Sequence, residues 1–121
     1  MKKKIKSQRQ LRINQQLKHL ISEIITMGDF QNKKIREIPL TVTEVDISPN
    51  LKKAIIFVVS RDGKKSFVKF LNEEIYIFKK EIAKKLYLRF VPELVFKYDN
   101  TFEYATKIEK ILKEPKVAKD L

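Results

Sequence analysis

Lysines and arginines are the side chains of this sequence that are numerous and clustered enough to bind a ligand. They number 27 against 15 Asp and Glu, which gives a formal net charge of +12. Residues 1–22 hold seven of these cations and no carboxylate, and residues 79–97 hold six against two carboxylates. Ammonium and guanidinium groups spread along a surface bind phosphates, so this balance points to a polyanion, either nucleic acid or anionic lipid. Either stretch alone could be an ordinary solvated face, but two in one short chain favour a binding surface.

The other residue types argue against catalysis. The absence of cysteine excludes disulfides, thiolate metal sites and cysteine nucleophiles. His19 has no second histidine as a partner, so neither a histidine-based metal cluster nor a nucleophilic triad has support. Two glycines cannot build a phosphate-binding glycine loop. Glu73, Glu74 and Glu81 are interpreted as helix-surface residues that balance nearby lysines. We therefore expect no enzymatic activity, no cofactor and no bound metal.

An amphipathic helix is predicted to position the first group of cations. Within residues 7–27, apolar side chains recur at spacings of three and four, which places on one face Ile13, Leu17, Leu20, Ile21, Ile24 and Ile25. Ser7 and Gln10 have the spacing of a capping box, and Gly28 is a stop signal. Residues 28–39 are then expected to form a basic loop.

Residues 40–47 and 54–60 are predicted strands. The first is rich in β-branched residues, and its apolar phase slips near Thr43 and Glu44, which predicts a bulge. The second is apolar throughout, which is typical of a strand that is central in its sheet or covered on both faces. Their short connection fits an antiparallel hairpin.

A longer helical pattern carries the second group of cations. Apolar residues recur at spacings of three and four over residues 66–86, which predicts one long helix or two helices joined at a kink. Pro92 disfavours helical backbone at the residue before it, so the helix must end there and residues 93–98 continue as a strand. Asn100 is predicted to begin a final helix that Pro115 closes. Three strands with helices packed against them make an α+β domain.

Exposed aromatic side chains could add base stacking to phosphate contacts. The candidates are Tyr76, Tyr87, Phe90 and Tyr104, although packing in the core or at its rim is the interpretation we favour for each.

The distribution of apolar residues indicates whether the protein could enter or bind a membrane. No run approaches eighteen consecutive apolar residues, and the lysines at the N-terminus are followed by polar residues. A basic first helix could lie on a membrane surface, but its apolar face is needed to cover the sheet. We therefore expect a cytoplasmic protein with no membrane partner.

Three segments of the chain resemble the bacterial ribosome-binding factor A family in order and spacing. They are "RINQQLKHLISEII", "LTVTEVDISPNLKKAIIFV" and "LYLRFVPELVFKYDNTFEYATKIEKIL". The most specific piece is "LRFVPELVFKYD", and the resemblance covers about residues 7–113. It implies a type II KH-like domain of order helix-strand-strand-helix-helix-strand plus a C-terminal helix. The implied function is non-catalytic: binding of the free 30S ribosomal subunit through 16S ribosomal RNA, and assistance in its late maturation and RNA processing.

The resemblance also implies how the chain is organised. Residues 1–6 would be a basic extension, residues 7–113 the RNA-binding domain and residues 114–121 a flexible tail. Family members kink their central helices at an alanine, any residue and usually a glycine, and the aligned residues here are Glu74, Ile75 and Tyr76. Because neither Glu nor Tyr has the backbone freedom of glycine, the kink would be weaker or set by packing.

In such a protein the basic face would contact ribosomal RNA phosphates. The residues predicted to do so are Arg9, Arg12, Lys33, Lys34, Lys79, Lys80, Lys84, Lys85 and Arg89. The partners expected are the 30S subunit and its 16S RNA, bound by a monomer, without a small-molecule substrate. Three alternatives stay open: a general RNA- or DNA-binding module, a permanent ribosomal protein, and a metal-dependent nuclease that would use Glu44 and Asp46.

Overall fold

The computed structural model describes residues 5–101 of the chain. The predicted α+β fold is confirmed, with α1 (Gln8–Met27), α2 (Lys34–Glu37), β1 (Leu40–Ile47), β2 (Lys53–Ser60), α3 (Phe67–Glu73), α4 (Ile75–Lys85) and β3 (Glu93–Tyr98). Apart from the short α2, this is the expected order of a KH-like domain. The predicted C-terminal helix, the tail, most of the N-terminal extension and Tyr104 lie outside the described residues.

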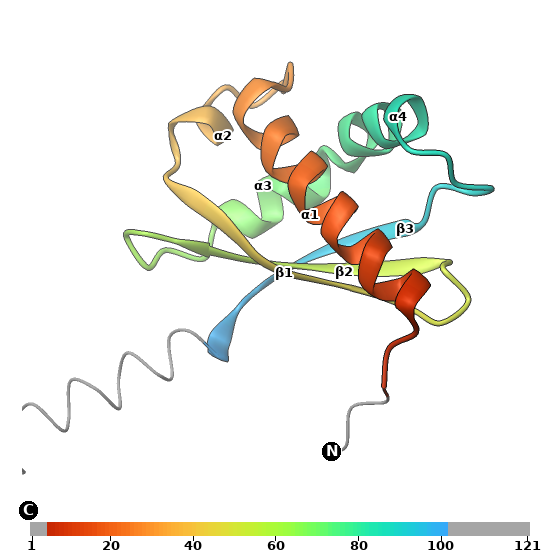
Figure 1. The fold of residues 1–121 in the computed structure, drawn as a ribbon. Coiled ribbons are helices and arrows are strands. Elements are labelled where there is room, and N and C mark those ends of the chain that lie inside the picture. The colour runs from red at the N-terminus through yellow and green to blue at the C-terminus, as the bar shows by residue number, and fades with distance from the viewer. Residues whose placement is uncertain (1–4, 102–121) are drawn as a thin grey trace, which may run out of the picture.

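One three-stranded sheet underlies all of the helices. Its order is β1-β2-β3, with β1 antiparallel and β3 parallel to the central β2. The central position explains why β2 is apolar throughout. A register shift between Val42 and Glu44 confirms the predicted bulge. Figure 1 shows α1, α3 and α4 on the same side of the sheet, so the core lies between these helices and that one face.

Local signals set both ends of α1. Ser7 Oγ accepts a hydrogen bond from the Gln10 N–H (3.1 Å), and Gln10 Oε1 accepts one from the Ser7 N–H (3.0 Å), which confirms the capping box. At the other end the Gly28 N–H donates to the carbonyl of Ile24. A Cβ at position 28 would lie 2.7 Å from that oxygen and 2.9 Å from the Phe30 ring, so only glycine fits. The six apolar residues predicted to face the core are all buried.

The long helical pattern is two helices, as one of the alternatives predicted. They are separated at Glu74, whose backbone (φ −114°, ψ 28°) is not helical. The residue is 5% exposed, and its carboxylate accepts hydrogen bonds from the backbone N–H groups of Gln31 and Asn32. The interpretation of Glu74 as a helix-surface residue was therefore wrong, because its partners come from a loop 42 and 43 residues earlier rather than from neighbouring lysines.

The segment predicted as a basic loop contains the short helix α2. Ile35 of α2 is fully buried, and the Asn32 side chain accepts from the Lys34 N–H at its start. The prediction missed α2 because four residues are too few to show a periodic pattern.

The connection from α4 to β3 begins earlier than predicted. The helix ends at Lys85, and Leu86 already has extended backbone (φ −115°, ψ 137°). Arg89, which was predicted to lie on the helix, therefore lies in the connection. The apolar spacing continued to Leu86, but that side chain packs on the core from extended chain instead.

Asn72 joins α3 to the outer edge of the sheet. Its Oδ1 accepts a hydrogen bond from the Phe96 N–H (2.9 Å), and its Nδ2 donates to the Phe96 carbonyl (3.1 Å). Both backbone groups of one β3 residue are thus satisfied by a single side chain. Among residues 5–101, no helix has the length and apolar character needed to cross a membrane.

Candidate nucleic-acid interface

A groove of about 360 Å³ lies between the N-terminal half of α1 and the segment that leaves α4. We call it the cationic groove; its lining residues are Arg9, Arg12, Ile13, Gln16, Lys85, Leu86, Tyr87 and Leu88. Three of the nine predicted contact residues meet here, and none of the carboxylates within residues 5–101 lines the groove. The fold thus brings cations of α1 and of the end of α4, which are far apart in the sequence, onto one surface.

Two polar side chains of α1 hold the helix that carries these arginines. The buried Gln10 donates from Nε2 to the Ile47 carbonyl (3.1 Å), and Asn14 Oδ1 accepts from the Ile47 N–H (2.9 Å). Both bonds join α1 to the end of β1, so the neighbouring Arg9 and Arg12 project from a fixed backbone.

Sequence reasoning missed this role of Gln10 and Asn14. Their spacing could have indicated this role. Residues four apart lie on the same side of a helix, and these two polar residues border the apolar face that covers the sheet.

The contacts of the two arginines in the cationic groove determine whether they are available to a partner. Within residues 5–101, neither Arg9 nor Arg12 forms an ion pair or a side-chain hydrogen bond, and both are exposed. In the adjoining connection, the Arg89 guanidinium lies over the Phe90 ring, 5.4 Å from its centre. Unpaired exposed cations can approach phosphates without breaking an internal contact.

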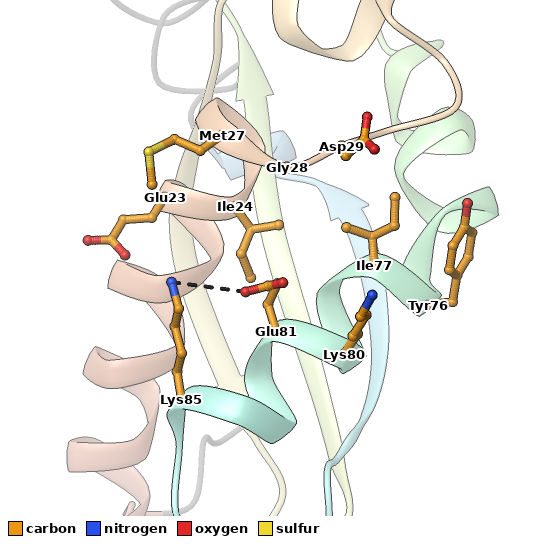
Figure 2. Close-up of a pocket in the computed structure, with 10 residues that line it drawn as sticks. All are labelled: Glu23, Ile24, Met27, Gly28, Asp29, Tyr76, Ile77, Lys80, Glu81 and Lys85. Atoms are coloured by element: carbon orange, nitrogen blue, oxygen red, sulfur yellow. Dashed lines mark ion pairs between the residues drawn. The ribbon is translucent and has the colours of Figure 1, made fainter.

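A second groove, of about 450 Å³, lies between the C-terminal half of α1 and α4. We call it the mixed groove; Figure 2 shows its lining residues, which are Glu23, Ile24, Met27, Gly28, Asp29, Tyr76, Ile77, Lys80, Glu81 and Lys85. Its three carboxylates outnumber its two lysines. In Figure 2, the side chains of Ile24 and Ile77 lie between α1 and α4, so part of the lining is apolar. Phosphates would meet repulsion from these carboxylates.

The lysines of α4 differ in how far they are engaged. Lys84 and Lys85 each pair with Glu81, at 3.9 and 4.0 Å. Lys79 and Lys80 are exposed and form no ion pair with the residues that the structure describes. Lys85 lines both grooves and marks the boundary between them.

Lys33 and Lys34 lie away from the cationic groove. Figure 1 shows α2 beside the C-terminal end of α1, and a 20-residue helix is about 30 Å long. Lys33 Nζ pairs with Asp29 Oδ1 (3.1 Å), and this hydrogen bond lowers the pKa of the Asp29 carboxyl below its ordinary value. Lys34 is exposed.

Arg36, on the same short helix, is used to build the fold. Its guanidinium donates to the carbonyls of Met27 (3.1 Å) and Gly28 (2.8 Å), which closes the end of α1. This short helix therefore stabilises the end of α1 that lies away from the cationic groove.

The three candidate aromatic residues that the structure describes are all exposed. Tyr87 is fully exposed, Phe90 is 64% exposed and Tyr76 is 54% exposed. The interpretation that favoured packing was wrong for these three, because the inward positions next to them are taken by Ile75, Leu86 and Leu88.

The residues considered for catalysis are engaged elsewhere. His19 is exposed and its Nε2 lies 3.1 Å from Glu23 Oε1. Asp46 accepts a hydrogen bond from Lys6 Nζ. Within residues 5–101, no three His, Cys, Asp or Glu side chains are grouped as metal ligands would be. The pKa of Asp62 is lowered by the Ser60 hydroxyl and the Lys64 N–H, at an exposed turn.

The sequence of the chain matches a known protein family. The family model described as ribosome-binding factor A matches residues 9–112. The chain is 38% identical over 117 residues to the ribosome-binding factor A of Paramagnetospirillum magneticum, covering 95% of this chain and 82% of that protein.

Solved structures agree in fold. The crystal structure of ribosome-binding factor A from Thermus thermophilus has a TM-score of 0.64 at 19% identity, covering 74% of this chain and 93% of that one. A homology model of the Thermus thermophilus protein, fitted into the cryo-EM map of a 30S complex, has a TM-score of 0.58 at 20% identity, covering 72% and 91%.

Proposed function

The chain belongs to the ribosome-binding factor A family, and from this premise we propose that it binds the free 30S ribosomal subunit through 16S ribosomal RNA. In this proposal the bound chain assists late maturation of the subunit, including processing of its RNA, without catalysing a reaction. It acts as a monomer in the cytoplasm. The structural neighbour described as part of a 30S complex supports the choice of subunit.

The observation that carries the proposal is that the two arginines of the cationic groove have no ion-pair partner in the part of the chain that the structure describes. Arg9 and Arg12 project from a helix fixed to the sheet, beside Lys85, and the described residues that line the groove include no carboxylate. Phosphate contacts of this kind supply most of the affinity of RNA-binding surfaces and make it dependent on salt. We assign the principal phosphate contacts to this groove and to Arg89.

The remaining predicted contacts have different weights in the proposal. Lys79, Lys80 and Lys84 extend the basic surface along α4. Lys33 and Lys34 would contact RNA only if it reached the other end of α1, and Lys33 already has Asp29 as a partner.

Sedimentation of a cell lysate through a gradient at moderate salt tests the function directly. We expect the protein to peak with free 30S subunits and to be absent from translating ribosomes. Equal amounts on both would favour a permanent ribosomal component. A signal confined to the light fractions at low salt would contradict ribosome binding.

Charge reversal tests the basic end of α4. Lys84→Glu combined with Lys85→Glu should weaken 30S binding, because it places negative charge at the edge of the cationic groove and removes the pairs with Glu81. Both side chains are at least half exposed, so the circular dichroism spectrum should be unchanged. Unchanged 30S affinity would exclude this patch as a contact.

A further inference from the structure

The connection between α4 and β3 displays aromatic side chains to solvent. We call residues 86–91 the aromatic loop; within it Tyr87 is fully exposed and Phe90 is 64% exposed. Aromatic rings usually bury a large apolar area, so two exposed rings in six residues indicate a contact surface.

Neighbouring side chains anchor this loop to the domain. Leu86, Leu88 and Val91 pack against the hydrophobic core, and Pro92 after them is buried. The inward residues alternate with Tyr87 and Arg89, so the loop backbone is held while these side chains point outward. A ring on a fixed backbone loses little conformational freedom when a partner stacks on it.

Tyr87 also shares the cationic groove with the arginines of α1. The residues that line this groove include Tyr87 together with Lys85, Arg9 and Arg12. Next to it, Arg89 lies over the Phe90 ring. Surfaces that bind single-stranded nucleic acid combine these two parts: cations that follow the backbone and rings on which bases stack.

We propose that Tyr87 is a stacking platform for an unpaired RNA base, with Arg9 and Arg12 holding phosphates of the same strand. The surface then selects unpaired RNA over duplex, because bases within an A-form duplex are already stacked on each other and cannot reach the ring. This inference rests on the proposed function and names the part of the RNA that the groove takes.

The test compares two probes and four forms of the full chain. The probes are a labelled, unstructured RNA of about ten nucleotides and the same RNA annealed to its complement, followed by fluorescence anisotropy. The forms are the wild type, Tyr87→Ala, Tyr87→Phe and Tyr76→Ala. The last is a matched control, because Tyr76 is also exposed but lines the mixed groove.

We expect Tyr87→Ala to lower affinity for the single strand by roughly ten-fold and to leave duplex affinity unchanged. Tyr87→Phe keeps the ring and should bind as the wild type does. Tyr76→Ala should also bind as the wild type does. Because Tyr87 is fully exposed, each variant should keep the wild-type circular dichroism spectrum.

Three results would overturn the inference: wild-type binding of the single strand by Tyr87→Ala, an equal loss in Tyr76→Ala, or a loss in Tyr87→Phe as large as in Tyr87→Ala. Binding of the wild-type chain to duplex but not to the single strand would overturn it as well. Pelleting with purified 30S subunits separates this inference from the proposed function. If wild type and Tyr87→Ala pellet equally, the stacking role fails and the proposed function stands; if neither pellets, the proposed function fails.

Discussion

The two grooves along α1 differ in how their charges are used. In the cationic groove Arg9 and Arg12 have no ion-pair partner among residues 5–101. In the mixed groove the carboxylates are engaged: Glu81 with Lys84 and Lys85, and Asp29 with Lys33. The count of basic residues alone therefore does not locate a binding surface. The cations available to a partner are those that the fold leaves unpaired.

Substitutions in the two regions should therefore affect different properties, stability in one and RNA affinity in the other. Changes at Glu74 and Gly28, beside and within the mixed groove, should alter stability and leave RNA affinity unchanged, because these residues contact other parts of the chain. Changes in the cationic groove should alter affinity and leave stability unchanged, because the side chains there contact little else.

The largest effect is expected for Glu74→Ala, beside the mixed groove. The variant leaves the N–H groups of Gln31 and Asn32 without their acceptor, which should lower the free energy of unfolding by about 3 kcal/mol. Urea denaturation measures the change, and Glu73→Ala, an exposed neighbour, is the control. The idea fails if the two variants are equally stable.

Gly28→Ala should have the next largest effect. The new Cβ would lie 2.7 Å from the Ile24 carbonyl, so the end of α1 must shift, at a cost of about 2 kcal/mol. The thermal midpoint should fall, while the folded fraction binds 30S subunits as the wild type does. A wild-type midpoint would show that this turn can relax without cost.

Arg9→Gln combined with Arg12→Gln should lower affinity and leave stability unchanged. The affinity for 30S subunits should fall on the order of ten-fold, and the slope of log affinity against log salt should become shallower by about 2. Stability should change by less than about 0.5 kcal/mol, because both side chains are exposed.

The matched control for this variant removes two charges elsewhere. Arg61→Gln combined with Lys69→Gln changes exposed cations that have no ion pair among residues 5–101. Figure 1 shows the connection from β2 to α3 at the opposite end of the sheet from the start of α1. Equal losses in the two double variants would mean that total charge, rather than the cationic groove, determines affinity.

Lys33→Ala should have the smallest effect. Without this partner the pKa of Asp29 should rise toward its ordinary value of 3.8, which an NMR titration can follow. In the wild type the pKa is lowered, so the stabilisation from the pair is present above pH 3.8 and is lost as the pH falls through the lowered pKa. The 30S affinity should stay within about two-fold; a larger loss would show that the α2 end also contacts RNA.

The sequence predicted the features that depend on neighbouring residues. The capping box of α1 needs only Ser7 and Gln10, and the bulge in β1 follows from a slip in alternation. Contacts between distant segments could not be predicted in this way. Glu74 meets a loop 42 and 43 residues earlier, so no local pattern shows that it is buried.

For the candidate site, too, the sequence predicted some features and not others. Its residue types were evident, since the cations of α1 and α4 stand out in the composition. Their grouping was not evident, because Arg9 and Lys85 meet only after the sheet brings α1 and the end of α4 together. The exposure of Tyr87 also depends on where the chain leaves α4, which sequence spacing placed too late.

The two hydrogen bonds between Asn72 and Phe96 have a consequence for association between molecules. An edge strand with free N–H and carbonyl groups is a template on which a second strand can pair, and this is a common start of aggregation. At the middle of β3 one side chain occupies both positions that an incoming strand would need. This chain therefore closes part of its own sheet edge with an asparagine.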